Sequence, residues 1–277
     1  MSKEFYSYDR VLECLNFSLN RAEGFNGNKF YLFDMQHYIR LKRKEEILKH
    51  IYWAINHDFE GFELYYQPII DINTKSIITL EALLRLKMKD EYIQPKEFIS
   101  LLEQTHLILP VGRWVLKTAM ESWKELQQLI PGLKMNVNMS FVQVNQNNSV
   151  QMIIDIIKEI DTTLLGIEIT ETGELNSNQY YNFCIGLEKG KRALILDDYG
   201  SGFSNVHRLT AAKPQYIKID HSFIKSDYYR KILKNTITDV IKSLGADYMQ
   251  GCLFARPMDK HSFIKNHKRM SENFLNN

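Results

Sequence analysis

The sequence predicts an α/β fold in which short buried strands alternate with helices. Helical patterns separate a series of short apolar segments, a sequence of elements typical of a parallel sheet with helical crossovers. These segments are Leu133–Ser140, Leu165–Thr170, Ala193–Asp198 and Tyr216–Asp220. A second observation is the stretch 194–202, where an apolar run leads into two adjacent acids and a Gly-Ser-Gly turn. We expect these acids, Asp197 and Asp198, to stand at the carboxyl end of a strand, where α/β proteins place their chemistry.

Composition sets broad limits. The chain has 277 residues, of which 44% are hydrophobic and 25% charged, as in soluble globular proteins. No segment approaches the roughly 18 uninterrupted apolar residues of a membrane span, and the start lacks a signal-peptide core, so we expect a cytoplasmic protein without membrane attachment. Three scattered cysteines indicate neither a disulfide framework nor a cysteine zinc site. A net charge of +2 does not favour DNA binding.

Residues 1–58 are interpreted as an N-terminal helical extension. A helical pattern covers Val11–Leu19, and a strand-like segment follows at Lys29–Asp34. A second helix is predicted over Lys42–Asn56, with an apolar face of Ile47, Ile51, Tyr52 and Ile55. This region is too small for a sheet domain of its own.

A hairpin comes next, followed by helices. The strands are Phe62–Ile70 and Ser76–Arg85, joined by a turn at Asp71–Lys75. Pro95 opens a helix that runs to Glu103, and a longer helix, Val111–Ile130, ends before Pro131-Gly132.

The remaining elements complete the alternation. Helices are predicted at Val150–Ile160, Ser177–Glu188 and Asp227–Leu244, and a last strand at Tyr248–Phe254. The segment 259–277 is a basic C-terminal tail, interpreted as a solvated helix face.

Polar residues gather at the predicted strand ends. They are Glu81, Asn138, Glu168, Glu171, Asp197, Asp198, Lys218, Asp220 and Gln250. Each acid alone is explained as solvated or as a helix cap. Arriving from separate strands at one rim, they would form a set of oxygen ligands suited to Mg²⁺ or Mn²⁺. Dinucleotide, Walker, zinc-protease and serine-hydrolase motifs do not occur.

In this order, the motifs resemble the EAL domain, the bacterial cyclic di-GMP phosphodiesterase family. The resemblance covers about residues 60–258 and defines a domain at 59–258. It is carried by Tyr66-Gln67-Pro68, Glu81-Ala82-Leu83-Leu84-Arg85, Asn136–Ser140, Glu168–Thr172, Asp197–Gly202, Lys218-Ile219-Asp220 and Gln250–Phe254.

The resemblance implies a TIM-like (β/α) barrel with an antiparallel first strand, and two Mg²⁺ or Mn²⁺ ions that cleave cyclic di-GMP to pGpG. The implied metal ligands are Glu81, Asn138, Glu168, Asp197 and Asp220. The implied nucleotide-binding residues are Gln67, Arg85 and Gln250. Among catalytic groups, Lys218 would stabilise charge and position the water, Asp198 would stand at the metal centre, and Glu171 would anchor the loop Tyr199–Ser204. That loop implies a homodimer.

One departure from the family pattern concerns the segment before Gln250. The family places a helix, a strand ending in Ala-Glu-Gly-Val-Glu and a second helix there, but residues 221–249 supply only 249 − 221 + 1 = 29 positions. One crossover already needs about 12. We therefore expect a barrel missing one strand-helix unit near residues 240–246, an incomplete metal site and impaired hydrolysis. Exposed strand edges would also invite a protein partner.

Residues Tyr31–Asp34 and the next helix resemble the end of a GGDEF domain, without its catalytic motif. Three hypotheses follow: a cyclic di-GMP-binding protein with impaired hydrolysis, an active phosphodiesterase, or a ligand-free regulator that acts by protein contact.

Overall fold

The computed structural model describes residues 8–23, 31–156, 164–170, 177–190, 192–199, 214–219, 247–251 and 255–276. The chain divides into two compact units, Met1–Asn56 and His57–Asn277. In the described residues, no helix is long and apolar enough to cross a membrane.

The first unit contains helices α1 (Tyr8–Glu23) and α2 (Met35–Asn56). Helix α2 begins earlier than predicted because the carboxylate of Asp34 accepts hydrogen bonds from the backbone N–H groups of Gln36 and His37, at 2.9 and 3.2 Å. Tyr52 was predicted on the buried face, and this is wrong, since its side chain is 47% exposed. The buried positions recur at helical spacing and are Tyr38, Ile47, Ile51 and Ala54.

The strand predicted at Lys29–Asp34 is wrong for residues 31–34, which have no regular structure. Residues 29 and 30 lie outside the described part. The segment contributes aromatic rings instead: the ring of Phe17 lies 6.1 Å from those of both Tyr31 and Phe33, in edge-on geometry. The described elements of this unit are helices and offer no sheet edge with which a strand could pair.

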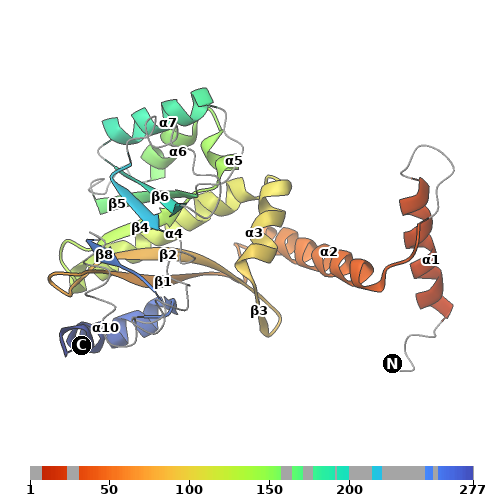
Figure 1. Cartoon of the computed structure of the whole chain (residues 1–277), viewed down its shortest axis with the longest axis horizontal. Coiled ribbons are helices and arrows are strands. Elements are labelled where there is room, and N and C mark those ends of the chain that lie inside the picture. The colour runs from red at the N-terminus through yellow and green to blue at the C-terminus, as the bar shows by residue number, and fades with distance from the viewer. Residues whose placement is uncertain are drawn as a thin grey trace, which may run out of the picture. The chain divides into compact units, whose positions relative to one another are not determined.

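The second unit is organised by one curved sheet (Figure 1). Strands β1 (Phe62–Asp71) and β2 (Ile77–Met88) form an antiparallel ribbon, to which β3 (Glu91–Ile93) is added at one end. Parallel strands continue from β2: β4 (Lys134–Asn138), β5 (Leu165–Thr170), β6 (Ala193–Tyr199) and β7 (Tyr216–Ile219). The strand order is β7-β6-β5-β4-β2-β1-β8. Strand β1 pairs antiparallel with β2, and β2 is parallel to β4, which confirms the predicted antiparallel first strand.

The C-terminal part of the chain pairs with the edge of β1 that faces away from β2. Strands β8 (Tyr248–Met249) and β9 (Met258–Asp259) both pair antiparallel with β1. The predicted strand to Phe254 is therefore shorter, because the chain leaves the sheet at Gln250, and residues 252–254 lie outside the described part.

Strands β7 and β8 end the strand path, and their first residues approach each other. The rings of Tyr216 and Tyr248 lie 5.7 Å apart in edge-on geometry. The strand-helix unit predicted to be missing near residues 240–246 falls outside the described residues.

Helices cover the sheet. They are α3 (Pro95–Gln104), α4 (Ile108–Leu129), α5 (Phe141–Val144), α6 (Ser149–Ile156) and α7 (Ser177–Lys189). Tyr66 on β1 is buried and hydrogen-bonds Ser122 of α4, so its side chain points to the helix layer. Because side chains alternate along a strand, the neighbouring Gln67 points to the opposite face, the inside of the curved sheet.

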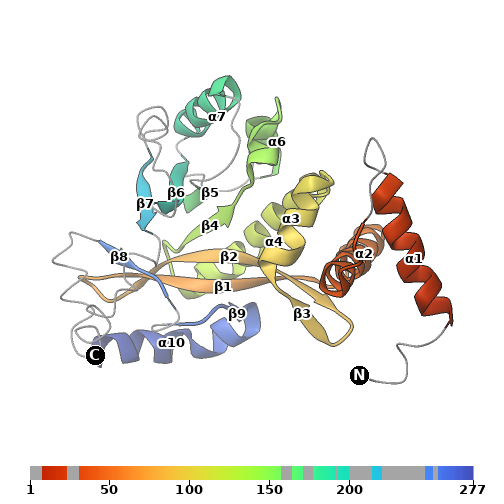
Figure 2. The same ribbon diagram turned by 45° about the vertical axis from the view of Figure 1, so that its right-hand side comes forward.

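The predicted basic tail is helix α10 (Lys260–Asn276), which runs alongside β1 and β9 (Figure 2). Asp259 starts it by accepting a hydrogen bond from the Ser262 backbone at 2.8 Å. Phe263 is fully buried. The helix therefore packs within the second unit and is not solvated on all sides.

Candidate active site

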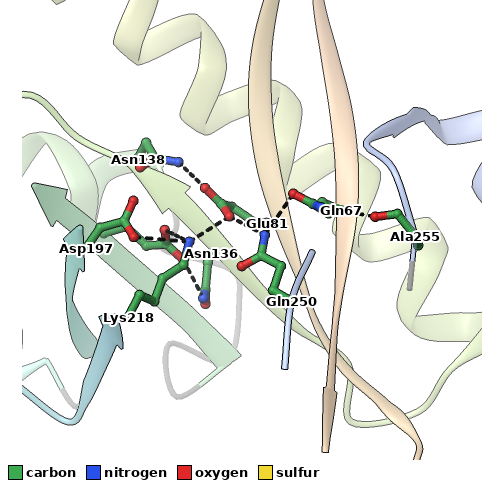
Figure 3. A network of polar contacts seen from close by, with 9 residues as sticks. Gln67, Glu81, Asn136, Asn138, Asp197, Lys218, Gln250 and Ala255 are labelled. Atoms are coloured by element: carbon green, nitrogen blue, oxygen red, sulfur yellow. Dashed lines mark hydrogen bonds and ion pairs between the residues drawn. The ribbon is translucent and has the colours of Figure 1, made fainter. Parts of the chain in front are cut away.

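Acids from three strands converge inside the curved sheet. Carboxylate oxygens of Glu81, Glu168 and Asp197, from β2, β5 and β6, all lie within 4.8 Å of one another. They meet because each strand is offset from its neighbour: Asn138 of β4 is level with Glu168, and Thr170 of β5 is level with Asp197. The sequence-predicted residues Glu81, Asp197, Asn138 and Lys218 lie together here (Figure 3), and Glu168 lies with them.

Lys218 of β7 bridges the acids. Its Nζ lies 2.8 Å from Glu81 Oε2, 2.8 Å from Glu168 Oε2 and 3.4 Å from Asp197 Oδ1. Burial alone would lower the pKa of Lys218, but the surrounding carboxylates outweigh it and raise that pKa. The lysine is therefore a permanent cation at neutral pH.

Glu81 is the acceptor at the centre of the network. Besides Lys218, it accepts hydrogen bonds from Asn138 Nδ2 at 2.7 Å and from Gln250 Nε2 at 2.5 Å. Burial acts to raise the pKa of Glu81, but the charge of Lys218 and these hydrogen bonds together lower it. Glu81 therefore stays ionised although it is only 4% exposed.

Glu168 lies in a different environment. It is fully buried, and burial together with the negative charges of Glu81 and Asp197 raises its pKa. Asn136 Nδ2 donates to its other oxygen at 2.8 Å.

Asn136 is a site residue that sequence reasoning missed. It stands two residues before Asn138 on β4, and the Asn-Val-Asn alternation places both amides on one strand face. Space for it is made on β5, because a side chain at Gly166 would collide with Asn136 Oδ1. The alternation was the signal that could have found it.

Two of the predicted nucleotide-binding residues join the network. Gln67 Nε2 donates to the Ala255 carbonyl at 3.0 Å, and Gln67 Oε1 accepts from Gln250 at 3.1 Å. Gln250 Oε1 is buried and has no hydrogen-bond partner among the described residues, so an acceptor beside the acids is left for a donor from a ligand.

Arg85, the third of these residues, makes no hydrogen bond or ion pair with the acids in the described part of the chain. It follows Glu81 by four positions on the same face of β2, where its guanidinium lies 5.5 Å from the centre of the Tyr65 ring.

The sequence of this chain matches a known protein family. The EAL domain model matches residues 54–238. The chain belongs to the EAL domain family. The probable cyclic di-GMP phosphodiesterase PdeI of Escherichia coli K12 is 30% identical over 262 residues, which are 82% of this chain and 33% of that protein. The chain spans about a third of the length of the curated relatives it matches.

Solved EAL structures share the fold. The EAL enzyme Bd1971, with cAMP and cyclic di-GMP bound, gives a TM-score of 0.71 at 22% identity, over 94% of this chain and 75% of that one. The PaMucR phosphodiesterase in complex with cyclic di-GMP gives 0.69 at 22% identity, over 78% and 99%. The fold is therefore the TIM-barrel-like EAL fold, as predicted.

The acid cluster fits a divalent metal. Its donors are carboxylate oxygens held close together, the ligands that Mg²⁺ and Mn²⁺ prefer. Three carboxylates against one lysine leave an excess of negative charge when all are ionised. Asn138 donates through Nδ2, so its Oδ1 stays available as a fourth oxygen.

Some predicted EAL residues cannot be placed. Glu171 and Asp220 lie outside the described residues, as does the loop beyond Tyr199. Asp198 belongs to β6, but its side chain is not described. Their roles stay predictions.

Proposed function

We propose that this EAL domain binds cyclic di-GMP at a divalent-metal site and hydrolyses it slowly or not at all. The observation that carries the proposal is the convergence of Glu81, Glu168 and Asp197 on Lys218, with the Gln67–Gln250 pair beside them. Cleavage of a phosphodiester requires that the negative charge of the phosphate oxygens is neutralised and that the nucleotide is held in position. The cationic Lys218 and the amide groups of Gln67 and Gln250 could do both.

A metal bound to the acids would neutralise phosphate oxygens and lower the pKa of a coordinated water. The protein's own side chains would bind and orient the nucleotide. Lys218 would offer positive charge to the phosphate, and Gln250 Oε1 would accept a hydrogen bond from the nucleotide. Glu81, Glu168 and Asp197, with Asn138 and Asp220, would hold the metals.

The same groups explain why turnover should be slow. The pKa of Lys218 is raised, so it cannot act as a base at neutral pH. Glu168 would be a metal ligand, so it would not be free to serve as the base. The 29 positions between Asp220 and Gln250 (249 − 221 + 1) contain no glutamate, so the family's glutamate has no counterpart there.

An active phosphodiesterase is the second candidate, favoured by the near-complete set of predicted metal ligands in the described site. In that case Asp198 or another acid would replace the absent glutamate. A ligand-free regulator is the third. We also infer a homodimer through the loop Tyr199–Ser204, which sedimentation of the purified chain would test.

Calorimetric titration with cyclic di-GMP, in Mg²⁺, in Mn²⁺ and in EDTA, tests the binding. We expect metal-dependent heat from the wild type and none from Asp197→Ala. No heat at high ligand concentration in any buffer would leave only the protein-contact hypothesis. Chromatographic detection of pGpG then distinguishes binding with impaired hydrolysis from active hydrolysis. Rapid metal-dependent formation of pGpG, abolished by Asp197→Ala, would overturn the slow-turnover proposal.

A further inference from the structure

Asn136 of β4 lies one step deeper in the curved sheet than the acid Glu168. Across the β4–β5 pair, Asn138 is level with Glu168, and Asn136 is level with Gly166. Two residues span about 7 Å of strand, so Asn136 lies toward the amino ends of the parallel strands, beneath the carboxylates. Its side chain joins the network around Lys218 (Figure 3) but is only 8% exposed. Asn136 is therefore placed to support the acid site from within the protein and not to meet a ligand directly.

The two carboxylate oxygens of Glu168 have different surroundings. Asn136 Nδ2 donates to Oε1 at 2.8 Å. The other oxygen, Oε2, lies 2.8 Å from Lys218 Nζ, the same ammonium group that contacts Glu81 and Asp197. The amide of Asn136 thus holds the oxygen that faces away from the point where the three acids meet, and Oε2 is turned toward that point.

Gly166 of β5 makes room for the Asn136 amide. A Cβ at this position would collide with Asn136 Oδ1 and would lie 2.5 Å from Ile195 Cδ1. Glycine weakens the interior of a strand, and where it occurs it often marks the close approach of another group. Here it leaves space for the oxygen of the Asn136 amide on β5, while the nitrogen faces Glu168. Asn136 and Gly166 are therefore a matched pair of residues on neighbouring strands.

We propose that Asn136 is a positioning residue for the metal site: its amide holds Glu168 Oε1, so that only Oε2 is presented to a divalent cation at the acids. The inference rests on the proposed function and adds to it a residue that acts through Glu168. A carboxylate can bind a cation through one oxygen or through both, and the terminal torsion of a glutamate rotates easily. A hydrogen bond to one oxygen removes that freedom before the cation arrives. Partners of this kind, one layer behind the ligands, typically contribute about 10–100-fold to metal affinity.

The test adds Mn²⁺ alone to the full chain and follows it by electron paramagnetic resonance, which reports both the free ion and the symmetry of the bound ion. Asn136→Leu keeps much of the side-chain volume without the donor. It should weaken Mn²⁺ binding about tenfold or more and change the signal of the bound ion, because Glu168 can then turn. Gly166→Ala should act in the same direction, since its methyl group displaces the amide.

The matched control is Ser149→Ala on α6. Ser149 is also buried, and its hydroxyl donates to the Val144 carbonyl at 3.3 Å, outside the acid site. This variant loses a buried hydrogen bond as well, so it shows what a loss of stability alone does to Mn²⁺ binding. We expect its affinity and its bound-ion signal to match those of wild type. Thermal melts without metal confirm that each variant is folded, and Asn136→Ala replaces Asn136→Leu if the larger side chain prevents folding.

The outcomes separate the two proposals. Wild type that binds no Mn²⁺ would overturn the proposed metal site and the role of Asn136 with it. Wild type that binds Mn²⁺, while the Asn136 variant keeps the same affinity, would overturn the positioning role alone. A weaker affinity with an unaltered bound-ion signal would also count against that role, because Glu168 would then be oriented as before. A tenfold loss with an altered signal in the Asn136 variant, and neither change in Ser149→Ala, would support the inference.

Discussion

The ammonium group of Lys218 on β7 lies 2.8 Å from the Glu81 carboxylate on β2, although 137 residues separate them in the chain. The pair joins opposite parts of the curved sheet, and Glu168 shares the same ammonium group at the same distance. Both carboxylates are buried, with side-chain exposures of 6% and 0%. The stability of the second unit and the chemistry of its site therefore depend on the same contacts.

Replacing Lys218 with methionine should lower the free energy of unfolding by about 3–5 kcal/mol, because Glu81 and Glu168 would remain buried without their counter-charge. Lys260→Met is the control, since Lys260 bonds the largely exposed Glu125 at 2.7 Å, and such a surface pair contributes less than about 1 kcal/mol. Urea unfolding at pH 7 measures both. Equal losses in the two variants would contradict the role assigned to the bridging lysine.

Gln250→Ala should weaken cyclic di-GMP binding by roughly tenfold or more, because it removes a hydrogen bond to the ionised Glu81 and the acceptor Oε1, which has no partner in the described part of the chain. The control is Gln179→Ala, a half-buried glutamine on α7 whose Nε2 donates to Asn147 Oδ1 at 3.0 Å in a solvent-exposed hydrogen bond. Calorimetry compares the two variants with wild type. Unchanged affinity in Gln250→Ala would remove this residue from the nucleotide site.

The ring pair Tyr216 and Tyr248 joins the two ends of the strand path. A double-mutant cycle with Tyr216→Ala and Tyr248→Ala should show a coupling energy of about 0.5–1.5 kcal/mol, the value typical of edge-on aromatic pairs. Chemical denaturation of wild type, both single variants and the double variant gives the cycle. Strictly additive losses would mean that the rings do not hold the strand ends together.

The buried Tyr66 should make the free energy of unfolding depend on pH in the alkaline range. Burial raises its pKa to about 12 in the folded chain, against about 10 when unfolded. The unfolded state releases this proton first, so the stabilisation is complete below pH 10 and is lost as the pH rises from about 10 to 12, by up to about 2–3 kcal/mol.

The phenylalanine of Tyr66→Phe cannot ionise, so the stability of this variant should fall less steeply than that of wild type as the pH rises. Urea unfolding at pH 8, 10 and 11 compares the two proteins. Parallel pH profiles would show that Tyr66 does not contribute.

The sequence by itself determined most of the secondary structure and the polarity of the strand ends. The alternation of apolar segments with helical patterns predicted the parallel strands, and the order of the motifs indicated the EAL family. These features are readable because periodicity and turn chemistry act over a few neighbouring residues. The N-terminal error has the same origin: residues 31–34 have a strand-like composition, but a strand also needs a partner, which composition does not report.

Tertiary structure alone decided which polar groups meet. Lys218 reaches three acids, and Gln250 joins Gln67 to Glu81, only because the sheet curves and each parallel strand is offset from the next. The tertiary structure also placed Asn136 against Glu168 and buried Phe263 of helix α10, for which the sequence had indicated only the solvated face. Such contacts depend on strand register and sheet curvature, which are fixed by packing across the whole unit and are not encoded in any single stretch of the chain.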